Sequence, residues 1–188
     1  MSSSVGIYAS QISGHLSTNN FSSIATVTVG SGGASSVSFT GIPSTYQHLQ
    51  VRFLGRSSYN NSGSSVNLYY RLNNDTASNY SQHAFRGDGN TVFASGSASQ
   101  GAMYPGAGIA DAGSTASVFG GGVLDLLDYA NTNKNKTARV LNGFDGNGNG
   151  QIVFSSGAWY STTAVNRLDL TTDGNWVQYS SFALYGIR

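Results

Sequence analysis

The 188-residue sequence contains no cysteine and no glutamate, and its only lysines are Lys134 and Lys136. Without cysteine the chain has no disulfide framework and no thiolate ligands for zinc. Glutamate and lysine are the residues that usually cover exposed helix surfaces, so their scarcity argues against a helical protein. Charged residues make up 9% of the chain, against about 25% in an ordinary globular domain. Serine, threonine, asparagine, glutamine and 25 glycines must therefore cover most of its surface.

Three further absences narrow the class of protein. The net charge is +1, which gives no electrostatic reason to expect binding to nucleic acid or to an anionic membrane. No apolar run approaches the ~18 residues of a membrane-spanning helix. The first twenty residues lack a basic start followed by an apolar block, so no signal peptide is predicted.

The chain does contain repeated alternation of apolar and polar residues, which is typical of half-buried strands. In residues 46–54, Leu49, Val51 and Phe53 occupy one face, and in residues 66–72 the apolar positions alternate in the same way. The pattern predicts an all-β fold, a β-sandwich of jelly-roll type with eight to ten antiparallel strands. The predicted strands are residues 24–29, 37–39, 46–54, 66–72, 80–86, 118–129, 137–144, 151–160, 165–170 and 176–187.

Three segments carry more specific expectations. Residues 182–187 are apolar at nearly every position, which predicts a final strand covered on both faces in the middle of the sandwich. Residues 94–117 are dominated by glycine, alanine and serine, and we expect a long excursion with at most short strands. The glycines at 120–122 predict a bulge or a close approach of backbones.

The domain prediction has two parts, an extended N-terminal arm at residues 1–23 and the sandwich at residues 24–188. The arm cannot build a core of its own, so we expect it to bind a partner. The sandwich has few lysines and prolines to protect its edge strands, and we expect neighbouring subunits to cover some of them. The apolar arm residues predicted to bind a partner are Val5, Ile7, Tyr8, Ile12 and Leu16.

No metal site is predicted from the residues. Asp145 to Gly150 copies the opening of a calcium-binding loop, but the twelfth position, which needs a bidentate glutamate, is Ser156. The segment is therefore interpreted as a hairpin turn rich in glycine and asparagine. The three histidines stand more than 30 residues apart with no cysteine to complete a zinc site.

No catalytic residue and no cofactor are predicted either. The sequence lacks the nucleophile elbow, the phosphate-binding loop and the zinc-protease motif. Asp125 and Asp128 are three apart in a strand and point to opposite faces, so they do not form a carboxylate pair.

Sugar binding is better supported by the residues than metal binding or catalysis. Flat aromatic side chains beside amide-rich loops are a common surface for stacking sugars. The competing interpretation is that these tyrosines are ordinary strand residues with the hydroxyl group in water, and both stay open at this point. The candidate glycan platform consists of Tyr59, Tyr104, Trp159 and Tyr160.

Four segments together resemble small structural proteins of tailed bacteriophages of aquatic bacteria, including cyanophages. The resemblance spans most of residues 36–188 and leaves the arm outside. Its residues are FTGIPSTYQHLQVR at 39–52, RLNNDTASNY at 71–80, LLDYANTNKNKTAR at 126–139 and FALYGI at 182–187.

The resemblance implies a virion structural protein without enzymatic activity, assembled in the host cytoplasm. We expect a capsid decoration protein that binds the outside of the shell, with the major capsid protein and copies of itself as partners in a homo-oligomer. The alternative is a receptor- or glycan-binding tip of a tail or head fibre. No coiled-coil or collagen-like shaft precedes the sandwich, which favours the decoration protein.

Overall fold

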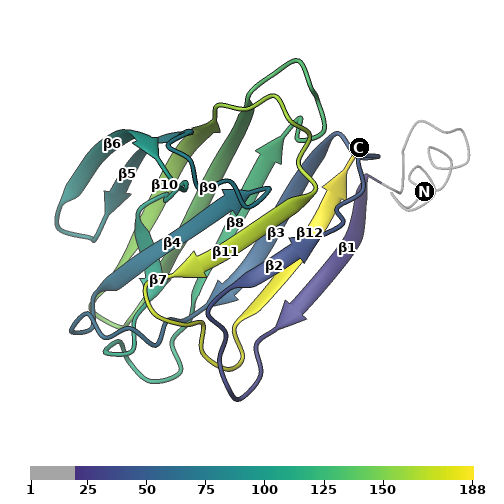
Figure 1. Ribbon diagram of the computed structural model, residues 1–188. Coiled ribbons are helices and arrows are strands. Elements are labelled where there is room, and N and C mark those ends of the chain that lie inside the picture. Colours follow the sequence, from purple (N-terminus) through teal and green to yellow (C-terminus); the bar gives the residue numbers. More distant parts are fainter. Residues whose placement is uncertain (1–19) are drawn as a thin grey trace, which may run out of the picture.

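The computed structural model describes residues 20–188, which form twelve β-strands and no helix (Figure 1). Neighbouring strands in both of its sheets pair antiparallel. No segment of this described part is a helix that could span a membrane. The predicted all-β fold is confirmed.

A sheet of eight strands packs face to face with a sheet of four (Figure 1). In spatial order, the large sheet contains β1 (Phe21–Thr28), β12 (Ser181–Ile187), β3 (His48–Gly55), β8 (Gly120–Leu127), β9 (Lys136–Asp145), β10 (Gly150–Trp159), β5 (Tyr80–Gly87) and β6 (Val92–Gln100). The small sheet contains β2 (Val37–Thr40), β11 (Arg167–Thr172), β4 (Ser65–Leu72) and β7 (Ala107–Ala110).

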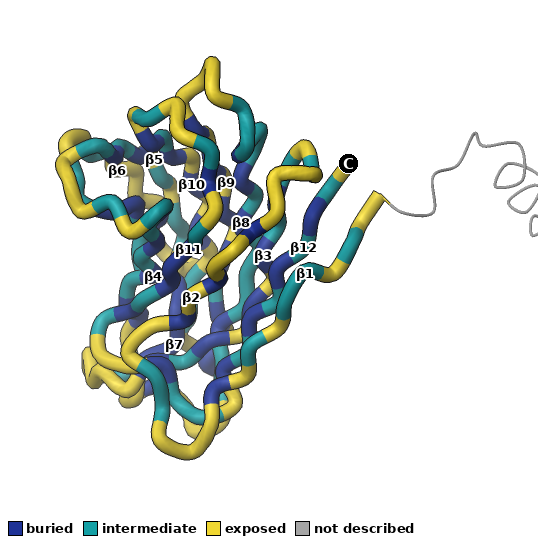
Figure 2. Tube along the Cα trace, turned by 45° about the vertical axis from the view of Figure 1, so that its right-hand side comes forward, coloured by how far each residue is buried: buried dark blue, intermediate teal, exposed yellow. Residues whose placement is uncertain are grey.

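The hydrophobic core fills the space between the two sheets, where the tube in Figure 2 is dark blue. In most strands alternate residues point into it, as the burial of Leu49, Val51 and Phe53 shows for β3. The largest buried side chain is Trp176, whose ring packs edge-on against Phe182 with centroids 4.9 Å apart. Its indole N–H donates to a backbone carbonyl, so the polar atom is satisfied inside the core.

The number of strands exceeds the eight to ten predicted, because β6 and β7 lie in the segment expected to be an excursion. Both are rich in glycine, alanine and serine, and beyond Val92, Phe93 and Ile109 they lack the β-branched and aromatic residues that mark a strand. Pairing with β5 and β4 holds them in place. Jelly-roll topology stays a prediction.

Two other expectations need correction. β12 lies second from the edge of the large sheet, outside its middle, and only one of its faces is buried. Phe182 and Leu184 point into the core, whereas Tyr185 on the opposite face is half-buried. The strand outside it is β1, which starts at Phe21, so residues 21–23 belong to the sheet and not to the arm.

The glycines at 120–122 produce a close approach and no bulge. Their pairing with both neighbouring strands is regular. A Cβ atom on Gly122 would lie 2.5 Å from the ring of Phe53 and 2.7 Å from Cβ of Asn142. Only glycine leaves room for these two side chains on the inner face of β8.

The large sheet extends beyond the small one at the edge formed by β5 and β6 (Figures 1 and 2). Most residues of β6 are exposed, since no strand covers it from the side of the core. This overhang is where the sandwich leaves the inner face of the large sheet accessible.

Candidate functional site

The outer face of the large sheet carries a row of apolar side chains across four adjacent strands. The strand register places Phe85 of β5 beside Phe154 of β10, then Leu141 of β9 and Val123 of β8. The rings of Phe85 and Phe154 are tilted against each other with centroids 5.9 Å apart. They form an aromatic ridge on the side away from the core.

The neighbouring row has large residues at its ends and glycine between them. Leu54 of β3 pairs with Gly121 of β8, which pairs with Gly143 of β9, which pairs with Ile152 of β10. Two glycines side by side leave a notch between Leu54 and Ile152, and its cavity volume is about 590 Å³. The residues around this notch are predominantly apolar.

We refer to these two rows as the outer patch. Five of its large side chains are about half exposed, from 44% for Phe154 to 58% for Ile152. Single exposed apolar residues are normal on a protein surface, but a contiguous group of them marks a site of interaction. The outer patch consists of Leu54, Phe85, Gly121, Val123, Leu141, Gly143, Ile152 and Phe154.

Several carboxylates with a lowered pKa hold turns and loops in place, and none of them is part of the outer patch. Side-chain hydrogen bonds from Asn79 and from the indole of Trp159 lower the pKa of Asp75. For Asp111, burial alone would raise the pKa. The hydroxyl of Ser114 and backbone N–H groups of the β3–β4 loop donate to it and outweigh burial, so its pKa also lies below the ordinary value.

The predicted glycan platform is not a single surface. Trp159 is 3% exposed and stacks on Tyr80 inside the core, so it has no face to offer a sugar. Tyr59 and Tyr160 are exposed at opposite ends of the sandwich. The backbone carbonyl of Tyr59 accepts a hydrogen bond from the N–H of Ala112, which follows β7, whereas the backbone N–H of Tyr160 donates to the carbonyl of Asn79, which precedes β5. Tyr104 lines a cavity of about 300 Å³.

The sequence interpretation of Asp145 to Gly150 as a hairpin turn is confirmed. The turn joins β9 to β10, the backbone N–H of Gly146 donates to Asn149, and Asn147 has a positive φ of 61°. Asp125 accepts from Gln50 and Asp128 from Lys134, so these two carboxylates have different partners. Among residues 20–188, no three histidine or aspartate side chains gather as metal ligands would.

The predicted partner-binding residues Val5, Ile7, Tyr8, Ile12 and Leu16 lie outside the described residues. The outer patch, in contrast, was missed by the sequence analysis. A signal for it exists in two strands, since Val140-Leu141 and Ile152-Val153-Phe154 are apolar at consecutive positions. In a strand with one face in water, such runs place apolar side chains outward.

Comparison with known proteins identifies no relative of established function. No protein-family model and no curated protein matches the chain. Among solved structures, a weak similarity is found to a protein of unknown function from Shewanella oneidensis MR-1. It is 12% identical, covers 91% of this chain and 77% of the other, and has a TM-score of 0.19, which is too low to support an argument about fold or function.

Proposed function

We propose that this chain is a structural protein of a bacteriophage virion, a capsid decoration protein that packs against a second copy of itself through the outer patch. The resemblance of residues 36–188 to small phage structural proteins supports the choice of particle. The observation that carries the proposal is the outer patch, because large apolar side chains exposed as one group are costly unless a neighbour covers them.

The outer patch has a shape that suits a second copy. The aromatic ridge of Phe85 and Phe154 lies two strands away from the notch over Gly121 and Gly143. A two-fold axis between β9 and β10 would bring the ridge of each copy over the notch region of the other. Such a contact is isologous, since the same surface serves on both sides.

The face is also large enough for a stable contact. Eight strands at a spacing of about 4.8 Å, with about eight residues rising 3.4 Å each, give a face of about 38 by 27 Å. This is about 1,000 Å², whereas each partner contributes about 800 Å² to an interface of standard size. Apolar interfaces of this kind are typical of permanent assemblies.

Counting copies in purified virions that contain the chain tests the proposed place in the particle. A decoration protein is expected in hundreds of copies, matched to the capsomers of the shell. A handful of copies per particle, as at a tail or fibre, would contradict the proposal. Virions that lack the chain should lose their shells at a lower temperature, and equal heat resistance would also contradict it.

A further inference from the structure

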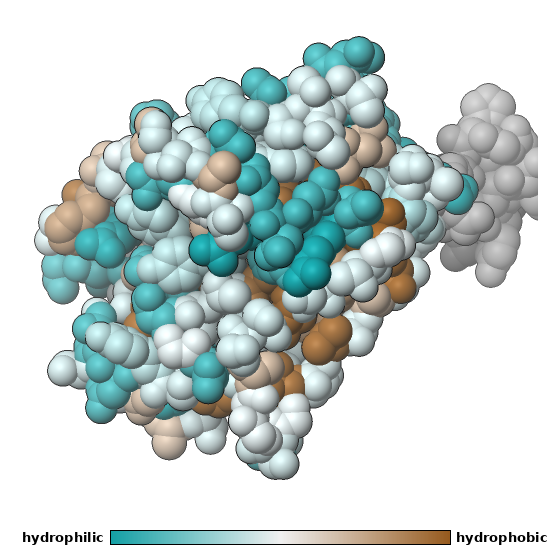
Figure 3. Space-filling model, in the orientation of Figure 1, coloured by the Kyte–Doolittle hydropathy of each residue, from teal (hydrophilic) through white to brown (hydrophobic). Residues whose placement is uncertain are grey.

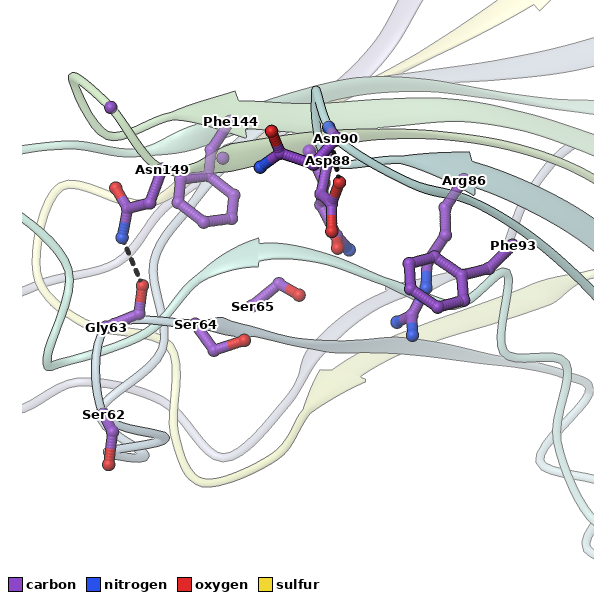
Figure 4. A pocket seen from close by; sticks show the side chains of 13 residues that line it. Ser62, Gly63, Ser64, Ser65, Arg86, Asp88, Asn90, Phe93, Phe144 and Asn149 are labelled. Carbon is purple, nitrogen blue, oxygen red and sulfur yellow. Dashed lines mark hydrogen bonds between the residues drawn. The ribbon is translucent and has the colours of Figure 1, made fainter.

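The overhang of the large sheet leaves a groove on its inner face, on the opposite side of the sheet from the outer patch. The register places Arg86 of β5 between Val153 of β10 and Phe93 of β6, so all three side chains point to the inner side. Ser64 and Ser65, at the start of β4, lie across from them, as Figure 4 shows. The groove is thus bounded by strands of both sheets.

The groove contains two adjoining cavities. One has a volume of about 370 Å³ and is closed at its far end by Asn149 and Gln151. The other has a volume of about 300 Å³ and includes Tyr104. Arg86 and Phe93 line both, which places them at the centre of the groove. The combined space matches that of ordinary small-molecule sites.

The guanidinium of Arg86 has one carboxylate in its neighbourhood, that of Asp88, whose pKa it helps to lower, but the two form no ion pair. The guanidinium lies 4.7 Å from the centroid of the Phe93 ring, and this stacking holds it in the groove. Within residues 20–188 it makes no hydrogen bond and no ion pair. The other strand arginines that line the inner space or the small sheet have polar partners, such as Asp169 for Arg167. The fork of donors on Arg86 is therefore free to bind a carboxylate in two-point fashion.

The remaining polar groups suit hydroxyls. Asp88 is fixed by the N–H groups of Asn90 and Thr91, which lower its pKa and leave its second oxygen free as an acceptor. The side-chain Nε2 of Gln151, which lines the same cavity as Asp88, is buried and has no partner among residues 20–188. Donor and acceptor groups beside an aromatic ring are what a sugar needs, since its faces are apolar and its rim carries hydroxyl groups.

We propose that this groove, which we call the Arg86 groove, binds a glycan that contains hexuronic acid, with the sugar carboxylate on Arg86 and the ring beside Phe93. A neutral sugar would leave the guanidinium without a charged hydrogen-bonding partner. A phosphate or sulfate group would bring more negative charge close to Asp88, which shares the cavity. One carboxylate with several hydroxyls satisfies both residues.

The test is to titrate the full chain with a trimer of galacturonic acid and to measure binding by calorimetry or by the shifts of backbone amide resonances. We expect binding, with the shifts centred on residues 86–93 and 148–151. Arg86→Gln should weaken binding at least about tenfold, because a charge-assisted pair is lost. Arg139→Gln is the matched control, since it removes the same charge from an exposed position on the other face of the sheet and should bind as the original chain does.

Thermal unfolding of both variants establishes that each is folded. Absence of uronate binding at millimolar concentration would overturn the proposal, as would equal binding by folded Arg86→Gln. Equal affinity for the neutral trimer of galactose, or for inorganic phosphate, would overturn the choice of ligand. Because the groove and the outer patch lie on opposite faces, none of these results depends on self-association.

Discussion

The two outer faces of the sandwich differ in how their exposed strand positions are used. On the small sheet, Asp169 accepts hydrogen bonds from Nε of Arg167 at 2.9 Å, from Nη2 of the same residue at 2.8 Å and from the hydroxyl of Ser38 at 2.6 Å. Nearby, Asp173 accepts from Asn67 and from the hydroxyl of Tyr69. Figure 3 looks onto this face, where the most hydrophilic residues gather over β11 and β2.

On the large sheet, the large side chains of the outer patch are leucine, isoleucine and phenylalanine without polar partners, while Gln50, Arg52 and Asp125 form a hydrogen-bonded group beside the patch. Both faces lie over the same core and are built from strands of the same alternating pattern. The difference therefore does not come from the fold. It shows that one face is suited to water and that the other is suited to a neighbour, which is what a subunit of an assembly requires.

The largest expected effect is on association. Phe154→Asp places a charge in the aromatic ridge and should weaken self-association by about 2 kcal/mol or more, about 30-fold. Its thermal stability should change little, since the side chain is exposed. Thr40→Asp on the small sheet adds the same charge and is the control. Sedimentation velocity measures both, and equal dissociation constants for the two variants would contradict the account.

The second effect is on folding and lies on the small sheet. Asp169→Ala removes the partner of both Arg167 and Ser38, and should lower the free energy of unfolding by about 1–2 kcal/mol. Urea denaturation measures this change. Self-association of the folded variant should be unaltered, and a loss of association would mean that the small sheet also takes part in the contact.

A third, smaller effect separates two adjacent glycines of the notch. A Cβ on Gly121 would lie 3.3 Å from the side chain of Leu54 and 3.7 Å from the backbone carbonyl oxygen of Phe53, so Gly121→Ala should fold normally. It fills the notch and should weaken self-association by about 1 kcal/mol, about fivefold. Gly143→Ala is the contrasting variant, since its Cβ would clash with the backbone carbonyl of Gln151 and should destabilise the fold itself. Sedimentation and thermal melting together distinguish the two, and unchanged association of Gly121→Ala would remove the notch from the contact.

The smallest effect is the pH dependence of folding. For Asp169, burial opposes ionisation, but hydrogen bonds from Arg167 and Ser38 outweigh it and lower the pKa in the folded state. The unfolded chain then binds more protons as pH falls, so stability is complete above about pH 4 and decreases below it. Urea titrations at pH 7 and pH 3 measure the change, which should be smaller in Asp169→Ala. The outer patch has no ionisable group, and a fold whose stability did not decrease in acid would contradict the assigned role of Asp169.

Much of the fold could be predicted from the sequence, because a strand with one buried face shows alternating apolar and polar residues. The inward positions of β3 and β4 follow directly from it, and all of them are buried. β6 and β7 were not predicted as strands, since stretches dominated by small residues become a strand only when a neighbour supplies hydrogen bonds. Local pattern does not carry that information.

The site was harder to predict than the fold. Trp159 was expected at the surface because it precedes a loop, but the register with β5 turns it inward against Tyr80. The outer patch combines residues of five strands that are far apart in the chain, so only the pairing of strands assembles it. Arg86 likewise becomes a candidate binding residue only because the large sheet extends beyond the small one, and the sequence does not show how wide each sheet is.

The most direct test of the central claim is hydroxyl-radical footprinting of the chain in dilute and in assembled form. Phe85, Leu141 and Phe154 are expected to react less with hydroxyl radicals in the assembled form, whereas the reactivity of Tyr69 on the small sheet should be unchanged. Equal reactivity of the three outer-patch residues in both forms would show that no neighbour covers this face, and it would contradict the account.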